Sequence, residues 1–225
     1  MRALNLSLLF KTLPVFMGYI PLGIAFGLLY GQLNAPWYYG VLMSIIVYAG
    51  SGQFLLVALL AAHAGYWEIL FASFLLNARH IFYGLSIMED LRSFGWRKHY
   101  IIFGLTDETY AMLKSSDFPE EIREESYFWM ALLHHFYWCL GGALGILVSE
   151  LTSFSWRGVE FSLTALFVVL TLSLLLKASS KKPFYLALIV GILALLFLPS
   201  EHMLILSILL CVGLLMLLRP YLERP

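Results

Sequence analysis

Charged residues are scarce in this chain. Asp, Glu, Lys and Arg make up only 12% of its 225 residues, whereas 61% are hydrophobic. So few polar side chains cannot cover the surface of a water-soluble domain of this length. The 14 basic residues are balanced by 14 acidic ones, which leaves no net charge to attract nucleic acid. The lack of net charge argues against nucleic-acid binding. The apolar composition predicts an integral membrane protein, and because backbone groups in lipid must be satisfied internally, we expect it to be all-α.

Cysteine is also nearly absent. Cys139 and Cys211 both lie in apolar segments, where a small polarisable side chain is ordinary packing material, so we expect no disulfide framework. His134 and His135 are chain neighbours, and on a helix they point about 100° apart, so they do not ligate one metal together. We therefore expect no metal site and no cofactor.

Long apolar runs, in contrast, fill most of the sequence. With about 20 residues needed to cross a bilayer, the runs predict seven transmembrane helices in a single polytopic membrane domain over residues 1–225. The predicted helices are 14–30, 38–62, 67–88, 128–148, 158–176, 183–199 and 201–218. No small-residue cleavage site follows Arg2 and Lys11, so the first helix is expected to be retained.

Residues 100–113 give an alternative count of eight helices. As a helix, this segment reaches only about 21 Å against a hydrocarbon core of about 30 Å. Both counts place the 177–182 loop and the C-terminus in the cytoplasm, because most Lys and Arg then lie on that side. The charged run 117–125 is predicted to be a solvated loop.

An internal repeat is visible at an offset of 118 residues. Leu22–Gly27 aligns with Leu140–Gly145, and Gly40-Val41 aligns with Gly158-Val159. This predicts two related halves, approximately 14–113 and 128–218. If residues 100–113 do not cross, three spans separate the copies and the repeat is inverted, which places a substrate site at the midplane. If they cross, the halves are parallel; we favour the inverted arrangement.

Polar residues interrupt the second apolar run at Tyr48–Gln53. Gly50 and Gly52 flank Ser51 and weaken the helix near mid-bilayer, which predicts a discontinuous helix whose N-terminus receives an anionic group. Ser51, Gly52 and Gln53 are therefore candidate substrate-binding residues. The alternative is a surface of small residues where helices pack closely. The Gly23-x-x-x-Gly27 and Gly141-x-x-x-Gly145 spacings favour packing.

The third apolar run contains Asn77-Ala78-Arg79-His80. A charge in hydrocarbon costs from about 3 to more than about 10 kcal/mol, so Arg79 is expected to face the protein interior. Its planar guanidinium matches a carboxylate, which makes Arg79 and Asn77 candidate substrate-binding residues. The alternative for Arg79 is a structural ion pair with Asp107 or Glu108. Asn77 and Arg79 lie about 200° apart on a regular helix, so both face the site only if the helix is irregular there.

Three titratable residues are candidates for binding an amine or coupling transport to protons. They are His80, Asp107 and Glu108. Two carboxylates in a mostly apolar segment can hold an ammonium group or a proton, and an imidazole such as that of His80, here next to Arg79, is a candidate proton-sensitive group. For the two carboxylates, the alternative is a polar helix end at the membrane surface.

These motifs together resemble the AzlC family, the large subunit of two-component branched-chain amino acid exporters. The resemblance rests on Gly18–Gly27, Ser51–Phe54, Asn77–His80 with Tyr83–Ser86, and Thr106–Glu108, and in order and spacing it covers roughly residues 14–220. It implies a non-enzymatic permease of the bacterial inner membrane. It further implies export of valine, leucine, isoleucine and sometimes methionine, together with a small AzlD-type membrane subunit.

The residues alone predict a transporter for a small zwitterion that works by alternating access. Two other classes stay open at this point. A passive channel or a non-transporting membrane subunit has the same composition. An intramembrane serine hydrolase could use Ser51 and His134, although no third residue to orient the histidine is evident.

Overall fold

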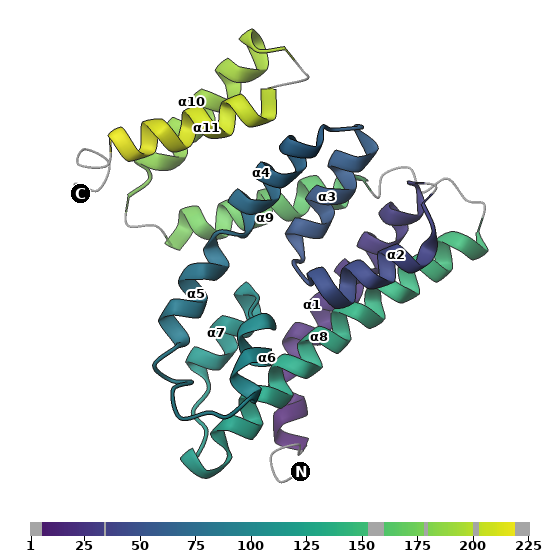
Figure 1. Cartoon of the computed structure of the whole chain (residues 1–225), viewed down its shortest axis with the longest axis vertical. Coiled ribbons are helices and arrows are strands. Elements are labelled where there is room, and N and C mark those ends of the chain that lie inside the picture. Colours follow the sequence, from purple (N-terminus) through teal and green to yellow (C-terminus); the bar gives the residue numbers. More distant parts are fainter. Residues whose placement is uncertain (1–5, 34, 153–159, 178–179, 200–202, 219–225) are drawn as a thin grey trace.

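The computed structural model describes residues 6–33, 35–152, 160–177, 180–199 and 203–218 (Figure 1). Every regular element in these ranges is helical. The first part contains α1 (Leu6–Gly31), α2 (Trp37–Leu42), the π-helix η1 (Met43–Val47), α3 (Ser51–Ala61), α4 (Tyr66–Asn77) and α5 (Arg79–Ile87). It is followed by α6 (Arg97–Phe103), α7 (Asp107–Ser115), α8 (Glu120–Leu151), α9 (Glu160–Lys177), α10 (Lys182–Phe197) and α11 (Met203–Leu217).

The long helices α1 and α8 run side by side in the same direction (Figure 1). Their glycines allow close contact: a Cβ added to Gly23 would lie 2.9 Å from Cα of Gly141, and one on Gly27 would lie 2.8 Å from the carbonyl carbon of Gly145. The prediction that both Gly-x-x-x-Gly spacings form packing surfaces is therefore confirmed. Neither helix leaves room for a side chain at these positions.

The same contacts correct the predicted direction of the repeat. Gly23 meets Gly141 and Gly27 meets Gly145, so the two copies of the glycine motif point the same way instead of being inverted. The physical reason is that the intervening segment 38–62 does not cross and therefore does not change the direction of the chain. Gly158 and Val159, which belong to the repeat alignment, lie outside the described residues.

Residues 38–62, predicted as one spanning helix, form a hairpin of two half-helices. The chain reverses after η1, where Tyr48 has φ 42° and Gly50 has φ 48°. Both ends of the hairpin lie near the C-terminal end of α1: the Tyr30 hydroxyl donates to the Pro36 carbonyl at 2.9 Å, and Leu33 and Ala61 line one cavity. The predicted break in the helix is thus present, but the chain turns back at this break and returns to the C-terminal end of α1.

A second hairpin, α6–α7, enters from the opposite end of the α1–α8 pair (Figure 1). Arg97 at the start of α6 lies over the Phe128 ring at 5.6 Å, and the Leu113 carbonyl near the end of α7 accepts a hydrogen bond from the Tyr127 hydroxyl at 3.0 Å. Both ends of the hairpin therefore lie at the first turns of α8. Residues 100–113 do not cross, and neither do residues 38–62, so the described helices agree neither with seven spans nor with the alternative of eight.

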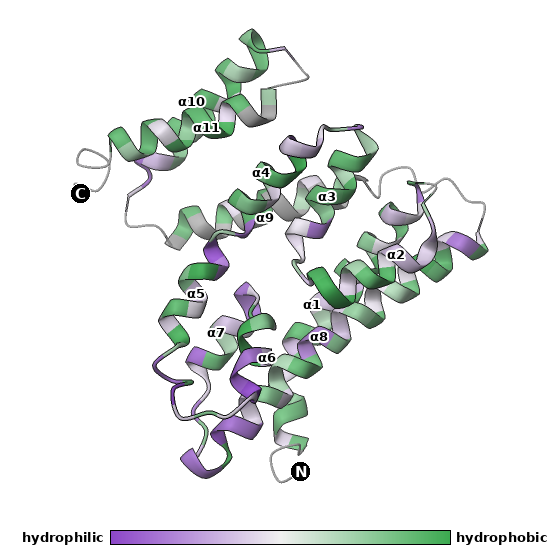
Figure 2. Cartoon of the chain, in the orientation of Figure 1, coloured by the Kyte–Doolittle hydropathy of each residue, from purple (hydrophilic) through white to green (hydrophobic). Residues whose placement is uncertain are grey.

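Three helical stretches among the described residues are long and apolar enough to span a membrane: α1, α4–α5 and α8. The predicted helices 158–176, 183–199 and 201–218 correspond to α9, α10 and α11; α9 packs on α3, and α11 packs on α4 and α10. Figure 2 shows that hydrophobic residues cover these elements, while hydrophilic residues gather around the connection that follows α5 and the first turns of α8. Helix α8 begins at Glu120, so most of the charged run 117–125 is helix and not a loop.

Candidate functional site

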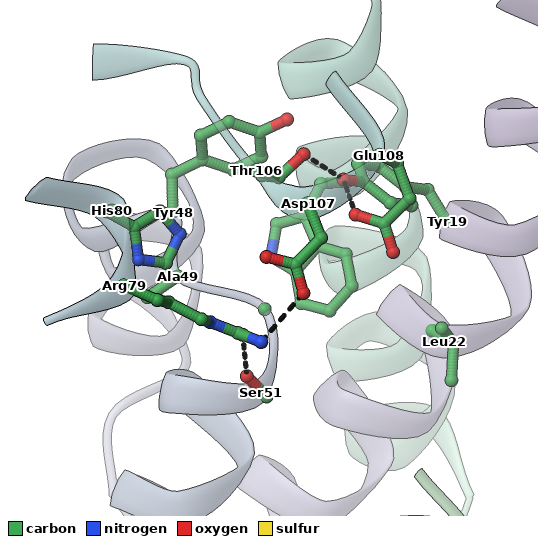
Figure 3. A pocket seen from close by; sticks show the side chains of 12 residues that line it. Tyr19, Leu22, Tyr48, Ala49, Ser51, Arg79, His80, Thr106, Asp107 and Glu108 are labelled. Atoms are coloured by element: carbon green, nitrogen blue, oxygen red, sulfur yellow. Dashed lines mark hydrogen bonds and ion pairs between the residues drawn. The ribbon is translucent and has the colours of Figure 1, made fainter. Parts of the chain in front are cut away.

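The tips of the two hairpins meet at a cavity beside the middle of α1 and α8 (Figure 3). The cavity is lined by residues from the N-termini of α3 and α7, from the start of α5 and from the long helices α1 and α8. They are Tyr19, Leu22, Tyr48, Ala49, Gly50, Ser51, Arg79, His80, Thr106, Asp107, Glu108 and Trp138. Five of the eight predicted site residues are in this lining, drawn together from three separate segments.

The local backbone explains why these segments end here. Gly50, with φ 48° and ψ −105°, precedes Ser51 at the start of α3, a conformation that glycine adopts because it has no Cβ. Thr106 caps α7 by accepting a hydrogen bond from the Thr109 backbone N–H at 3.1 Å. The positive ends of α3 and α7 thus point to the cavity, where they favour anionic groups.

Arg79 joins the two hairpin tips. Its Nη1 lies 2.7 Å from Oδ2 of Asp107 and its Nη2 donates to Oγ of Ser51 at 2.9 Å (Figure 3). The Arg79 and Asp107 side chains are 27% and 29% exposed. Within the described part of the chain, Nε of Arg79 and Oδ1 of Asp107 are buried without a hydrogen-bond partner. The pair is therefore electrically neutral, accessible from the cavity and incompletely satisfied.

Glu108 and His80 have different partners. Glu108 accepts a hydrogen bond from the Tyr19 hydroxyl at 2.8 Å, and that hydroxyl also lies 2.6 Å from Oγ1 of Thr106. Nδ1 of His80 lies 3.1 Å from the Asn77 carbonyl oxygen, across the boundary between α4 and α5 at Ala78. The two carboxylates of α7 are thus directed to separate neighbours, Asp107 to Arg79 and Glu108 to Tyr19.

The other three predicted residues, Gly52, Gln53 and Asn77, lie behind the lining. A Cβ on Gly52 would lie 2.9 Å from Nδ2 of Asn77, so these two residues form a close contact between α3 and α4. Gln53 is fully buried; its Oε1 accepts from Nε1 of Trp138 at 2.8 Å and its Nε2 donates to Ser44 at 3.5 Å. These residues hold the α3 tip in place. Asn77 and Arg79 both contact α3, at Gly52 and Ser51 respectively, where α4 ends and α5 begins.

Tyr19, Tyr48, Thr106 and Trp138 were not predicted as site residues. Thr106 could have been recognised as a helix cap, because a threonine directly precedes the acidic first turn Asp107-Glu108. Tyr19, Tyr48 and Trp138 lie in apolar runs, where aromatic residues are common in any membrane protein. They become site residues only through the approach of the hairpin tips.

The Ser51–His134 pair that an intramembrane hydrolase would need does not form. Ser51 accepts from Arg79, whereas Nδ1 of the fully buried His134 lies 2.9 Å from the Thr109 hydroxyl. A serine nucleophile needs its base within hydrogen-bond reach, so this arrangement gives no support to acyl transfer. No cluster of three or more potential metal ligands occurs among residues whose positions are described.

Comparison with known proteins identifies the family. The model of the family described as AzlC protein matches residues 14–152. An uncharacterized membrane protein of Helicobacter pylori is 34% identical over 94% of this chain and 93% of its own. The branched-chain amino acid transport protein AzlC of Bacillus subtilis is 31% identical over 95% of this chain and 84% of its own.

A more distant relative is the inner membrane protein YgaZ of Escherichia coli, 30% identical over 76% of this chain and 71% of its own. No solved structure matches. The family match and the names of these relatives agree with the apolar helices of the chain. The chain therefore belongs to the AzlC family of membrane transport proteins.

Proposed function

We propose that this protein exports branched-chain amino acids, namely valine, leucine and isoleucine with methionine as a further substrate, across the bacterial inner membrane. The observation that carries the proposal is the accessible Arg79–Asp107 pair where the two hairpin tips meet. A neutral pair of opposite charges is complementary to a zwitterion. The name of the Bacillus subtilis relative supports the choice of substrate.

The binding mode follows from the unsatisfied groups. The substrate carboxylate replaces Asp107 at the Arg79 guanidinium, beside Ser51 and the positive end of α3. The substrate ammonium group then pairs with the released Asp107 and with Glu108. Leu22 and Trp138 supply apolar wall for the aliphatic side chain. In this way each charge that leaves the internal pair gains a partner.

Transport requires the hairpins to move. The cavity has a volume of about 50 Å³, room for a few water molecules but not for leucine. Because the hairpins enter from opposite ends of α1 and α8 (Figure 1), withdrawal of the α3 tip opens the cavity toward one end and withdrawal of the α7 tip opens it toward the other. This is a form of alternating access, and proton transfer at His80, Asp107 or Glu108 supplies the energy.

The partner and orientation complete the proposal. We assign a small AzlD-type membrane subunit as the partner, and we place the 177–182 loop and the C-terminus in the cytoplasm because Lys and Arg are concentrated there. The Escherichia coli relative is named an inner membrane protein, which supports that location. Catalysis is not part of the proposal.

The test is counterflow of labelled leucine into proteoliposomes that contain this chain and its partner and are preloaded with unlabelled leucine. We expect saturable uptake, lost in Arg79→Ala and kept in Arg92→Ala, a control that removes an exposed arginine outside the cavity. Uptake that does not saturate would indicate a channel. If the wild type showed no uptake, a panel of other amino acids would test a different zwitterion, and failure of all of them would indicate a non-transporting subunit.

A further inference from the structure

A continuous chain of hydrogen bonds leads from the cavity into the core between α1, α7 and α8. It begins at Glu108, whose Oε2 lies 2.8 Å from the Tyr19 hydroxyl, and passes to Thr106 at 2.6 Å. Thr106 and Thr109 follow, with Oγ1 atoms 2.9 Å apart, and Thr109 lies 2.9 Å from Nδ1 of His134. Three hydroxyl groups therefore connect two titratable side chains.

This series of hydrogen bonds runs from an exposed residue to fully buried ones. Glu108 is exposed at the cavity, Tyr19 is 5% exposed, Thr106 is 7% exposed, and Thr109 and His134 are fully buried. His134 does not line the cavity. Its Nδ1 reaches Glu108 through the three hydroxyls, and within the described residues its Nε2 is buried without a hydrogen-bond partner.

The chemistry of the links permits proton movement. A hydroxyl carries one proton and can accept a hydrogen bond as well as donate one, so a row of hydroxyls can be polarised in either direction. In one state Glu108 is protonated and each group donates toward Nδ1 of His134. In the other state Glu108 is a carboxylate, Nδ1 carries the proton and every hydrogen bond is reversed.

We propose that Tyr19, Thr106 and Thr109 relay a proton between Glu108 and His134, so that His134 stores the proton that is exchanged for substrate. Glu108 gives its proton to Tyr19, Tyr19 gives its own to Thr106, Thr106 to Thr109 and Thr109 to Nδ1. One proton leaves Glu108 and one arrives at His134, and each of the three hydroxyls between them exchanges its own proton for the one that it receives. The inference rests on the proposed function and deepens it.

The substrate drives this transfer. An ammonium group beside Glu108 favours the carboxylate form and displaces the proton toward His134. When the substrate leaves, a charged imidazole enclosed by protein is unfavourable, and the proton returns to Glu108 and the cavity. Substrate and proton therefore compete for one carboxylate, which is the requirement for exchanging one for the other.

Other titratable groups surround the two ends of the relay. The groups around Glu108 are Tyr19 of α1, Tyr48 of the first hairpin tip, Arg79, His80 and Tyr83 of α5, and Asp107 of α7. His134 faces Tyr19 at a ring distance of 6.2 Å and Tyr137 of its own helix at 6.4 Å. The His134 end is thus bordered by phenols, while carboxylates and cations gather at the Glu108 end.

The test separates exchange from net transport in the same proteoliposomes. Leucine counterflow at equal pH on both sides requires no net proton movement. Leucine transport driven by a pH gradient requires protons to cross the membrane, and a pH-sensitive dye inside the vesicles measures that proton movement. Thr109→Val removes the hydroxyl while keeping the shape and the α7 cap, which uses the Thr109 backbone. Thr109→Ser restores a hydroxyl, and His134→Asn keeps a polar atom near the Nδ1 position without a titratable ring.

We expect Thr109→Val and His134→Asn to keep counterflow within about twofold and to lose gradient-driven transport and substrate-linked proton flux by at least about tenfold. Thr109→Ser should keep all three. Equal loss of counterflow and gradient-driven transport would show that these hydrogen bonds have only a structural role. Retention of both activities would show that the hydrogen bonds have no role in transport. Either result overturns the relay.

The wild-type protein distinguishes the two proposals. Leucine counterflow combined with net leucine transport that moves no protons would leave the proposed leucine export standing, remove its proton coupling and overturn the relay. Absence of leucine exchange would overturn the proposed function and, with it, the inference that depends on it.

Discussion

Nη1 of Arg79 lies 2.7 Å from Oδ2 of Asp107, although the two residues are 28 positions apart in the sequence. Arg79 starts α5 at a kink, and Asp107 starts α7 directly after a chain reversal. The ion pair therefore forms only when a hairpin tip is in place beside the kinked helix. The pair is partly exposed and incompletely hydrogen-bonded, and in the proposed function it closes the empty cavity and opens around a zwitterion.

Asp107→Asn should change which ligand the cavity prefers. The substitution leaves Arg79 without its carboxylate partner and removes one partner for a substrate ammonium group. We compare 4-methylpentanoate, which is leucine without its amino group, with unlabelled leucine as inhibitors of leucine counterflow. Relative to leucine, 4-methylpentanoate should be a stronger inhibitor of the variant than of the wild type. Loss of one charge pair in a partly exposed site predicts a shift of about tenfold in that ratio, or about 1.4 kcal/mol.

Asp117→Asn is the matched control for this substitution, because Asp117 is exposed and lies outside the cavity. It should leave the ratio unchanged. An unchanged ratio in Asp107→Asn as well would show that Asp107 does not face the substrate ammonium group.

The hairpin topology predicts which loops share a side of the membrane. In a background with both cysteines replaced, single cysteines at Ala35 and His63, which flank the first hairpin, should react with a membrane-impermeant maleimide from one side. Cysteines at Ser93 and Ser115, which flank the second hairpin, should react from the other side. The physical reason is that each hairpin returns to the end at which it entered (Figure 1).

A single crossing by residues 38–62 would instead place Ala35 and His63 on opposite sides. Labelling of intact and inside-out vesicles distinguishes the two arrangements. Labelling of Ala35→Cys and His63→Cys from different sides would contradict the hairpin.

The sequence singles out charged residues of the cavity lining more readily than it predicts the path of the chain. Arg79, Asp107 and Glu108 stand out because charge is expensive in an apolar run, and all three line the cavity. The topology is harder, because 25 apolar residues have the same composition whether they cross once or turn back halfway. The local signals for the first hairpin were Gly50 and the small residues beside it.

Gln53 shows a second limit of prediction. An amide within an apolar run was interpreted as a ligand-binding group, but the fully buried side chain is hydrogen-bonded to Trp138, 85 positions away. Only the three-dimensional structure reveals such a partner. Tyr19 shows the converse, since its hydroxyl contacts Thr106 and Glu108 although nothing around it in the sequence distinguishes it from a packing residue.

Gly50→Ala should impair the tip of the first hairpin. Gly50 has φ 48° and ψ −105°, a backbone conformation that L-residues with a Cβ adopt only with strain of roughly 1–3 kcal/mol. We expect reduced leucine counterflow, because Ser51 and the α3 N-terminus follow directly. Gly65→Ala is the control, since Gly65 has φ −66° and nothing within 4 Å of an added Cβ. Wild-type counterflow in Gly50→Ala would mean that the tip tolerates a different conformation.

Gly27→Ala should separate α1 from α8. The added methyl group would meet the backbone of Gly142, Gly145 and Ile146, and backbone atoms in a helix cannot rotate away as a flexible side chain can. Overpacking of this kind costs about 1–3 kcal/mol, so the thermal unfolding midpoint in detergent should fall.

Gly18→Ala in the same helix is the matched control for Gly27→Ala. Gly18 is exposed and has nothing within 4 Å of an added Cβ, so alanine should leave stability unchanged or raise it by roughly 0.5–1 kcal/mol through its higher helix propensity. Equal midpoints for the two variants would contradict the close α1–α8 contact. A lower midpoint for Gly27→Ala alone would support this contact. Because Tyr19 of α1 and Trp138 of α8 line the cavity, the Gly27→Ala variant should also lose leucine counterflow.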